Sequence, residues 1–163
     1  MSSLTLTSPA FAEGGRIPVE HTPLGADWSP ELRLSGVDPR AASLVVTFDD
    51  ASHPLFPNYN HWVIWNVPAA DVVPGAVPPG ERVASLGGAV QGRAYGRHRY
   101  KGPKPPFRSE HVYTFTVYAV DCLVDVPPSG RRADVLQAIE GHVLQTATLS
   151  GTFRRRDVPS SDI

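Results

Sequence analysis

Three stretches of the chain have the hydrophobic pattern of β-strands. Residues 44–48 and 62–67 are continuous apolar runs rich in Val and aromatic side chains, and turn residues separate them. Such runs predict neighbouring strands that are buried on both faces. In residues 111–120 apolar and polar positions alternate, which places His111 and Tyr113 on the same face of a third strand.

Weaker patterns predict three further strands and one helix. The strands fall in residues 4–6, 29–34 and 143–153. The helix covers residues 131–140, with Val135, Leu136 and Ile139 on its apolar face. Gly141 is the expected stop of this helix, and Ser129 is a candidate N-terminal cap.

Two long segments lack a regular pattern. Residues 68–92 are rich in Pro, Gly, Ala and Val, which predicts a long surface excursion. Residues 93–107 combine basic and aromatic residues with several prolines. Because proline is excluded from central strands and helix interiors, this segment is predicted to be a loop of restricted shape.

Composition agrees with a loop-rich β protein. The chain has 163 residues with 17 Pro and 14 Gly, which predicts a single domain over residues 1–163, with residues 154–163 as a mobile tail. Because the net charge is -1, we do not expect general nucleic-acid binding. The lone cysteine, the absence of a signal-like N-terminus and the absence of a membrane-spanning run lead us to expect a cytoplasmic protein without membrane insertion.

Ionisable residues gather where the first two strands should leave the core. Asp49 and Asp50 end one strand, and their side chains should point to opposite faces. That spacing argues against a catalytic carboxylate pair. The ordinary interpretation is that both carboxylates are solvated at a turn or accept backbone N–H bonds there. His61 and His111 each begin a strand, and if those strands are close, both imidazoles could lie beside Asp50 and bind an anion.

Other chemistries have weaker support in the sequence. A zinc site could use Asp50, His61 and His111, but no short metal-ligand spacing is present, and we expect neither a metal nor another cofactor. A hydrolase could use His61 or His111 as general base, although Ser52 and His53 are adjacent and no nucleophile elbow surrounds them.

A basic, proline-rich rim is the last candidate feature. Residues 102–106 read GPKPP, in which glycine allows close approach of the backbone and proline fixes the loop in advance. Five basic residues surround this rim, which favours a phosphate or carboxylate ligand. They are Arg97, Arg99, Lys101, Lys104 and Arg108.

Together these motifs resemble the phosphatidylethanolamine-binding protein family, also called Raf kinase inhibitor-like proteins, and in particular its bacterial branch. The first family signature, of the type DDPDAP followed by HW or HF, is similar to DDASHP at 49–54 and HW at 61–62. The second, YGGPxPP followed by GxHRY, is similar to YKGPKPP at 100–106 and EHVY at 110–113. The similarity extends over residues 11–154.

The resemblance implies a mainly β fold, in which a large central antiparallel sheet is accompanied by a smaller second sheet and a few peripheral helices. It also implies a small preformed pocket for an anionic group such as phosphate, a phospholipid headgroup or a phosphorylated side chain. In it Asp50 would orient the histidines, His61 and His111 would donate to the anion, and a lip at residues 102–106 would close one side. The implied ligand-binding residues are Asp50, Ser52, Pro54, His61, Gly102, Pro105, His111 and Tyr113.

Family members bind lipids and nucleotides, and some inhibit kinases or proteases, so the resemblance also implies a kinase or protease as a protein partner and a homodimer. A protein that acts only through its surface, with a vestigial pocket, is the remaining alternative. The chain departs from the signatures at Ser52, where the family has Asp, and at Val112, where it has Arg. We interpret the two departures as compensating losses of an ion pair. The family also leads us to expect a cis peptide bond between His53 and Pro54.

Overall fold

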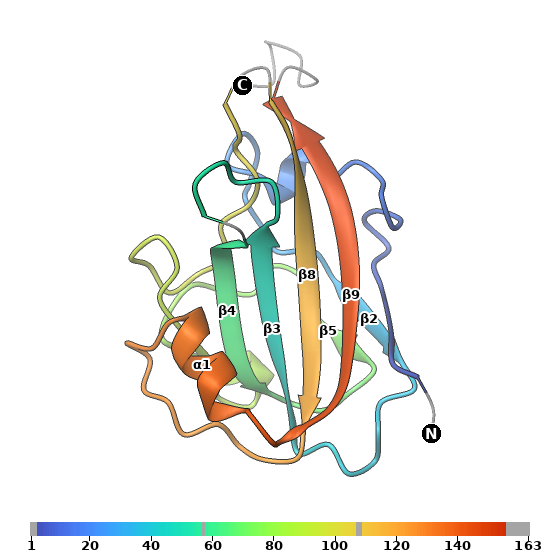
Figure 1. The fold of residues 1–163 in the computed structure, drawn as a ribbon, viewed down its shortest axis with the longest axis vertical. Helices are drawn as coiled ribbons and strands as arrows, with labels where there is room; N and C mark the ends of the chain where they lie inside the picture. Colours follow the sequence, from blue (N-terminus) through green and yellow to red (C-terminus); the bar gives the residue numbers. More distant parts are fainter. Residues whose placement is uncertain (1–2, 57, 107–108, 156–163) are drawn as a thin grey trace.

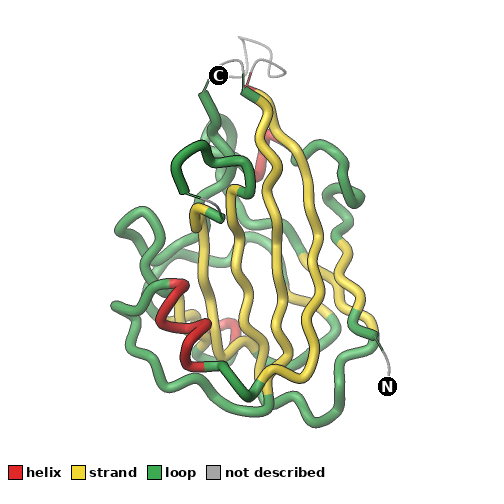
Figure 2. Tube along the Cα trace, in the orientation of Figure 1, coloured by secondary structure: helices red, strands yellow, loops and turns green. Residues whose placement is uncertain are grey.

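The computed structural model describes residues 3–56, 58–106 and 109–155. The expected tail at 154–163 therefore lies outside the described residues from position 156 onward. Two antiparallel sheets make up most of the fold, and one α-helix accompanies them (Figures 1 and 2). The mainly β fold class predicted from the resemblance is confirmed.

The larger sheet has six strands in the order β6-β7-β4-β3-β8-β9. These are β3 (Ser43–Asp50), β4 (Tyr59–Val67), β6 (Arg82–Val83), β7 (Ala89–Gln91), β8 (Glu110–Val120) and β9 (Val143–Arg154). All eight positions of β3 are buried, because β3 has a strand on each side and packed layers on both faces. The two apolar runs and the alternating third strand were thus predicted correctly.

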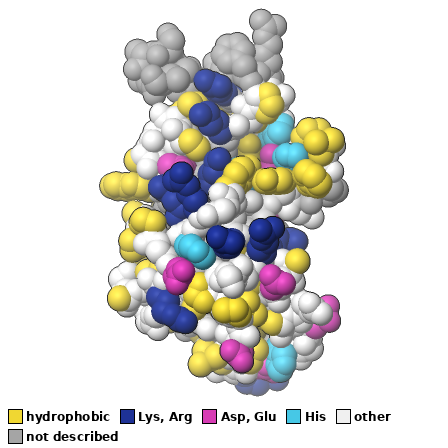
Figure 3. All heavy atoms as spheres, turned by 90° about the vertical axis from the view of Figure 1, so that its left-hand side faces the viewer, with side chains coloured by type: hydrophobic (Ala, Val, Ile, Leu, Met, Phe, Trp, Pro, Cys, Tyr) yellow, Lys and Arg dark blue, Asp and Glu magenta, His cyan; other side chains and the backbone are white. Residues whose placement is uncertain are grey.

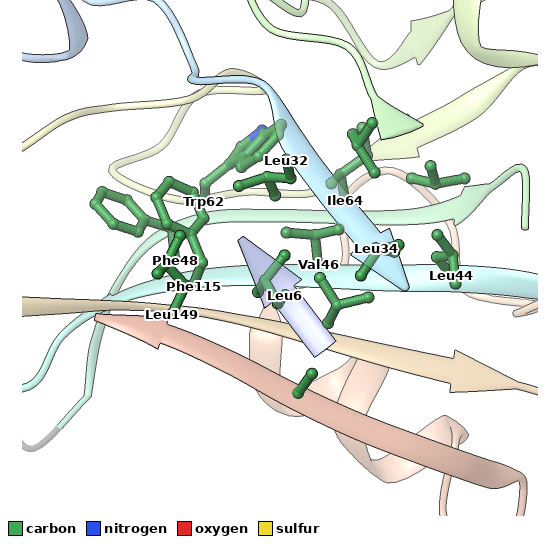
Figure 4. Packing of buried hydrophobic residues seen from close by; sticks show 14 of the residues in the cluster. Leu6, Leu32, Leu34, Leu44, Val46, Phe48, Trp62, Ile64, Phe115 and Leu149 are labelled. Carbon is green, nitrogen blue, oxygen red and sulfur yellow. The ribbon is translucent and has the colours of Figure 1, made fainter. Parts of the chain in front are cut away.

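The smaller sheet has the order β1-β2-β5 and covers one face of the larger one. Its strands are β1 (Thr5–Thr7), β2 (Leu32–Ser35) and β5 (Val72–Val73). Figure 4 shows Leu6, Leu32 and Leu34 from this sheet packed over Val46 and Phe48 of β3, in one apolar cluster. Burial of these side chains supplies most of the driving force for the two-layer arrangement.

On the opposite face of the larger sheet, α1 (Arg132–Ala138) packs near β4, beside its lower half in Figure 1. Val135 and Ile139 from this helix region are buried against Val45, Val63 and Trp65. The helix was predicted, but its proposed cap was wrong. Arg131 rather than Ser129 precedes the first turn, and the Arg131 backbone N–H donates to the Asp134 carboxylate at 2.9 Å.

The segment predicted as a surface excursion is more ordered than expected. Residues 68–92 contribute β5, β6, β7 and the short 3-10 helix Ala84–Leu86, and Gln91 is fully buried. The Gln91 amide accepts from Trp62 Nε1 at 2.8 Å and donates to the Pro78 and Gly80 carbonyls. These long-range bonds hold a segment whose local sequence has no strand signal.

Among the described residues no helix has the length and apolarity needed to cross a membrane.

Candidate functional site

The candidate site lies at the end of the larger sheet where β3 finishes and β4 and β8 begin. Asp50 pairs with Tyr59 of β4 and with Tyr113 of β8, so three strands bring their ends together here. Because alternate residues share a face, His111 lies on the same side of β8 as Tyr113. The strand ends thereby place an acid, a histidine and a tyrosine beside one another.

A β-bulge in β4 turns His61 toward the same face. Phe48 pairs with Trp62 and Asp49 pairs with Asn60, so His61 is an extra residue without a partner on β3. Strict alternation would place His61 opposite Trp62, but both rings lie on the side of the main core. The His61 ring makes edge contacts with Phe48 and Tyr113, with centroids 5.9 and 5.5 Å apart. Bulges commonly re-aim side chains in this way near functional sites.

Asp50 and His111 form a buried pair. His111 Nδ1 donates to Asp50 Oδ2 at 2.6 Å, and the Ser52 backbone N–H donates to Asp50 Oδ1 at 2.9 Å. Since a carboxylate oxygen only accepts, the proton of the neutral ring sits on Nδ1 and the pair fixes the orientation of the imidazole. Asp50 is therefore buried rather than solvated, but it does accept a backbone N–H in the turn after β3, which was the other ordinary role expected of it.

His61 is held differently. Its Nδ1 donates to the Lys101 backbone carbonyl at 2.9 Å, and its Nε2 lies 3.3 Å from the Tyr95 hydroxyl. Burial lowers the pKa of His61 to about 4, so at neutral pH Nε2 carries a lone pair and Tyr95 is the donor. The expected donation from His61 to an anion therefore requires the ring to take up a proton.

The segment of residues 100–106 forms the wall that faces these strand ends. The Tyr100 hydroxyl donates to the His21 carbonyl at 2.7 Å, and the Gly102 N–H donates to the Asp27 carboxylate at 2.8 Å. A Cβ at Gly102 would collide with the His21 carbonyl oxygen, which explains the need for glycine. The expectation that the Gly102 backbone is available to a ligand is wrong, because Asp27 already occupies its N–H.

These elements enclose a cavity of about 290 Å³, here called the His61–His111 cavity. Six of the eight expected ligand-binding residues line it, whereas Ser52 and Gly102 do not. Five further residues complete the wall. The full lining is Asp50, His53, Pro54, His61, Tyr95, Lys101, Lys104, Pro105, Pro106, His111 and Tyr113.

Tyr95 was not singled out in the sequence. It lies in a loop without periodicity, 34 residues from the histidine that it contacts. Its only local signal is the Tyr95-Gly96 pair, since glycine marks tight turns. Lys101 was noted as part of the basic rim, and its ammonium group stacks 3.8 Å above the Tyr95 ring. Arg108 of that rim falls outside the described residues.

Two further expectations concern the loop after β3. The described peptide bonds are all trans, so the expected cis bond between His53 and Pro54 is wrong. Ser52 and Val112, the two departures from the family signatures, do contact each other, since the Val112 N–H donates to Ser52 Oγ at 2.9 Å. The interpretation that Ser52 and Val112 replace an Asp–Arg ion pair stays a prediction.

Asp49 points to the other face, as the alternation predicted. Its side chain is buried and accepts from Asn60 Nδ2 at 2.9 Å, while Arg132 Nε lies 3.2 Å away. Burial raises the pKa of Asp49, and Asn60 and Arg132 oppose that rise. Asp49 therefore anchors α1 to the sheet and has no access to the His61–His111 cavity.

One group of potential metal ligands lies outside the cavity in the described part of the chain. Ligand atoms of Asp121, Cys122 and His142 lie within 4.8 Å of one another, and His142 Nδ1 already donates to Asp121 at 2.8 Å. Asp50, His61 and His111 form no such cluster among the described residues.

The fold and cavity define a two-sheet β protein with a ligand-sized cavity at the end of its larger sheet. The family model described as phosphatidylethanolamine-binding protein matches residues 7–154. A UPF0098 protein of Methanothermobacter thermautotrophicus is 40% identical over 157 residues, which cover 93% of this chain and 99% of the relative. One from Pyrococcus abyssi is 35% identical over 151 residues, covering 91% of this chain and 84% of the relative.

Solved structures show the same similarity. The crystal structure of a phosphatidylethanolamine-binding protein homolog from Chlamydia trachomatis superposes with a TM-score of 0.82 at 29% identity. YbcL of Escherichia coli, described as a member of the mammalian PEBP family, superposes with a TM-score of 0.83 at 27% identity. Each comparison covers 94% of this chain and 99% of the other. This chain belongs to the phosphatidylethanolamine-binding protein family, and the resemblance noted in its motifs is confirmed.

Proposed function

We propose that the protein binds a small anionic group, such as phosphate, a phospholipid headgroup or a phosphorylated side chain, in the His61–His111 cavity. The observation that carries the proposal is the charge balance of the lining. Asp50 is the only acid there among the described residues, and the His111 ring and the Ser52 N–H already satisfy it. Lys101 and Lys104 face the same space, so an incoming anion meets unneutralised cations.

In this proposal each residue has a distinct role. Asp50 holds the His111 ring so that Nε2 is the nitrogen available to a ligand. His111 would contact the anion through Nε2, because its Nδ1 is bonded to Asp50. Tyr113 and Pro54 form walls, and Lys104 contributes charge from the proline-rich lip. A preformed cavity of this kind lowers the ordering cost of binding.

Calorimetric titration of phosphate and phosphoethanolamine at pH 7 tests the proposal. We expect saturable one-site binding with a Kd of about 1 mM or below for phosphate, a free energy of about -4 kcal/mol. His111→Ala should weaken binding at least ten-fold. His142→Ala, which removes an exposed histidine outside the cavity, is the matched control and should bind like the parent protein. Absence of saturable binding in the parent protein would contradict the proposal.

A hydrolase with His111 or His61 as general base is the second candidate. The Asp50–His111 pair favours it, because a carboxylate-oriented histidine is the arrangement that activates a nucleophile in acyl transfer. The described cavity lining contains no Ser, Thr or Cys, so the nucleophile would have to be water. Turnover of a generic ester that is lost in His111→Ala would support this candidate, and binding without turnover would support the first.

A further inference from the structure

A second cavity adjoins the first. It has a volume of about 370 Å³ and is here called the Arg97 cavity. Tyr95 and Lys101 line both cavities and so form the partition between them. The remaining lining residues are Pro23, Asp27, Ala94, Arg97 and Arg99. Figure 3 shows the face to the left of β4 in Figure 1, where Lys and Arg side chains gather around the middle of the molecule.

A tight turn builds the partition. The Ala94 and Arg97 backbones exchange two hydrogen bonds of 3.1 and 3.0 Å, and the two residues between them, Tyr95 and Gly96, have φ angles of 54° and 68°. Two successive left-handed residues define a type I′ turn, a conformation that a tyrosine adopts at an energetic cost. Strained backbone of this kind is frequent where a side chain must be held at a ligand site. The turn holds the Tyr95 ring between His61 and Lys101.

The cations around the Arg97 cavity outnumber the acids. Among the described residues Asp27 is the only acid in its lining. That carboxylate accepts from the Gly102 N–H and lies 3.8 Å from Arg99. The exposed Arg97 guanidinium has no side-chain hydrogen bond or ion pair within residues 3–56, 58–106 and 109–155. Burial lowers the pKa of Lys101, and the like charges of Lys104 and Arg97 lower it further against the opposing effect of Asp27. Asp27 therefore offsets only part of the positive charge around the cavity, because one carboxylate faces Arg97, Arg99 and Lys101.

A bound anion would reduce the repulsion between these positive charges. The His61–His111 cavity takes one anionic group in the function proposed above. Lys101 faces both cavities, so it can contact an anion in either and can bridge two that belong to one molecule. Arg97 then supplies a guanidinium, which suits the planar, multidentate recognition of a phosphate group.

We propose that the ligand is a small molecule with two phosphate groups, one in the His61–His111 cavity and the other in the Arg97 cavity, joined across the Tyr95–Lys101 partition. This inference rests on the proposed function, because it takes the first cavity as an anion site. It adds the substrate class, a bisphosphorylated small molecule, and assigns Arg97 as the residue that distinguishes it from a monophosphate.

The test compares matched probes by calorimetry at constant ionic strength. Fructose 6-phosphate and fructose 1,6-bisphosphate differ by one phosphate, and inorganic phosphate and pyrophosphate give a second pair with a shorter span. We expect at least one bisphosphate or diphosphate to bind about ten-fold tighter than its monophosphate. Arg97→Ala should abolish that preference while changing monophosphate affinity less than two-fold.

Arg82→Ala is the matched control, because it removes the same charge from an exposed position on β6 that lines neither cavity. It should retain the full preference. Equal affinities within both probe pairs would overturn the inference and leave the proposed function standing. Equal weakening of both probes by Arg97→Ala would also overturn it, since that result indicates a general field effect. Failure of every probe to bind would overturn both proposals.

Discussion

At the scale of the residue, His61 shows how surroundings decide what an imidazole can do. The ring is almost completely buried, one nitrogen is committed to the Lys101 carbonyl, and the other faces the Tyr95 hydroxyl. Burial lowers the pKa to about 4, against the ordinary value of 6.5. Between pH 6.5 and 4, His61 is therefore protonated in the unfolded chain and neutral in the folded protein. The contribution of His61 to stability is complete above pH 6.5 and decreases as the pH falls through this interval.

We expect His61 to make the protein less stable in mild acid. Between pH 7.5 and pH 5 this one group should remove about 2 kcal/mol of unfolding free energy. Urea unfolding of the parent protein and of His61→Gln, in a buffer without phosphate, measures the effect, because glutamine keeps a donor and an acceptor but does not titrate. The parent protein should lose about 2 kcal/mol more than the variant over this range. Parallel losses would show that His61 is not held neutral.

At the scale of the element, an ion pair with a buried acid on the sheet reinforces the apolar packing of α1. Asp49 is buried on β3, and Arg132 at the start of the helix supplies its positive partner. Asn60 binds the same carboxylate, and its position follows from the bulge that also turns His61 into the cavity. The two carboxylates at the end of β3 thus have different roles. Asp49 on one face supports the fold, and Asp50 on the other positions His111.

Arg132→Ala should destabilise the protein by about 2 kcal/mol at pH 7, because it leaves a buried carboxylate without its cation. The pKa of Asp49, already raised by burial, should rise further in the variant. Protonation of Asp49 then removes the cost of burying an unpaired charge. The difference in unfolding free energy between the variant and the parent protein should therefore shrink as the pH is lowered to 5. Arg131→Ala, at the neighbouring exposed position, is the control and should change stability by less than about 0.5 kcal/mol in urea unfolding. A destabilisation that is constant with pH would contradict this account.

At the scale of the whole molecule, local patterns predicted the long strands of the larger sheet, whereas distant contacts shaped the site and the short strands β5, β6 and β7. The runs at 44–48 and 62–67 and the alternation at 111–120 are local signals, so the central strands were predictable. The bulge at His61 is not predictable from alternation, because it depends on which residues of β3 and β4 pair. The role of Gly102 depends on Asp27, 75 residues earlier, and the place of Tyr95 depends on a turn of a rare conformation. The family resemblance identified six of the eleven described residues that line the His61–His111 cavity. Only the structure shows that Tyr95 and Lys101 separate this cavity from the Arg97 cavity.

The central claim is that His61 and His111 meet at one anion site. The most direct measurement is a phosphate titration at pH 7 and constant ionic strength, followed through the imidazole NMR signals of all six histidines. The account predicts saturable shifts of the His61 and His111 signals with one common Kd. His98 and His142, which contact neither of these rings, should stay unchanged. Absence of a saturable response at His61 and His111, or equal drift of every histidine, would contradict the account.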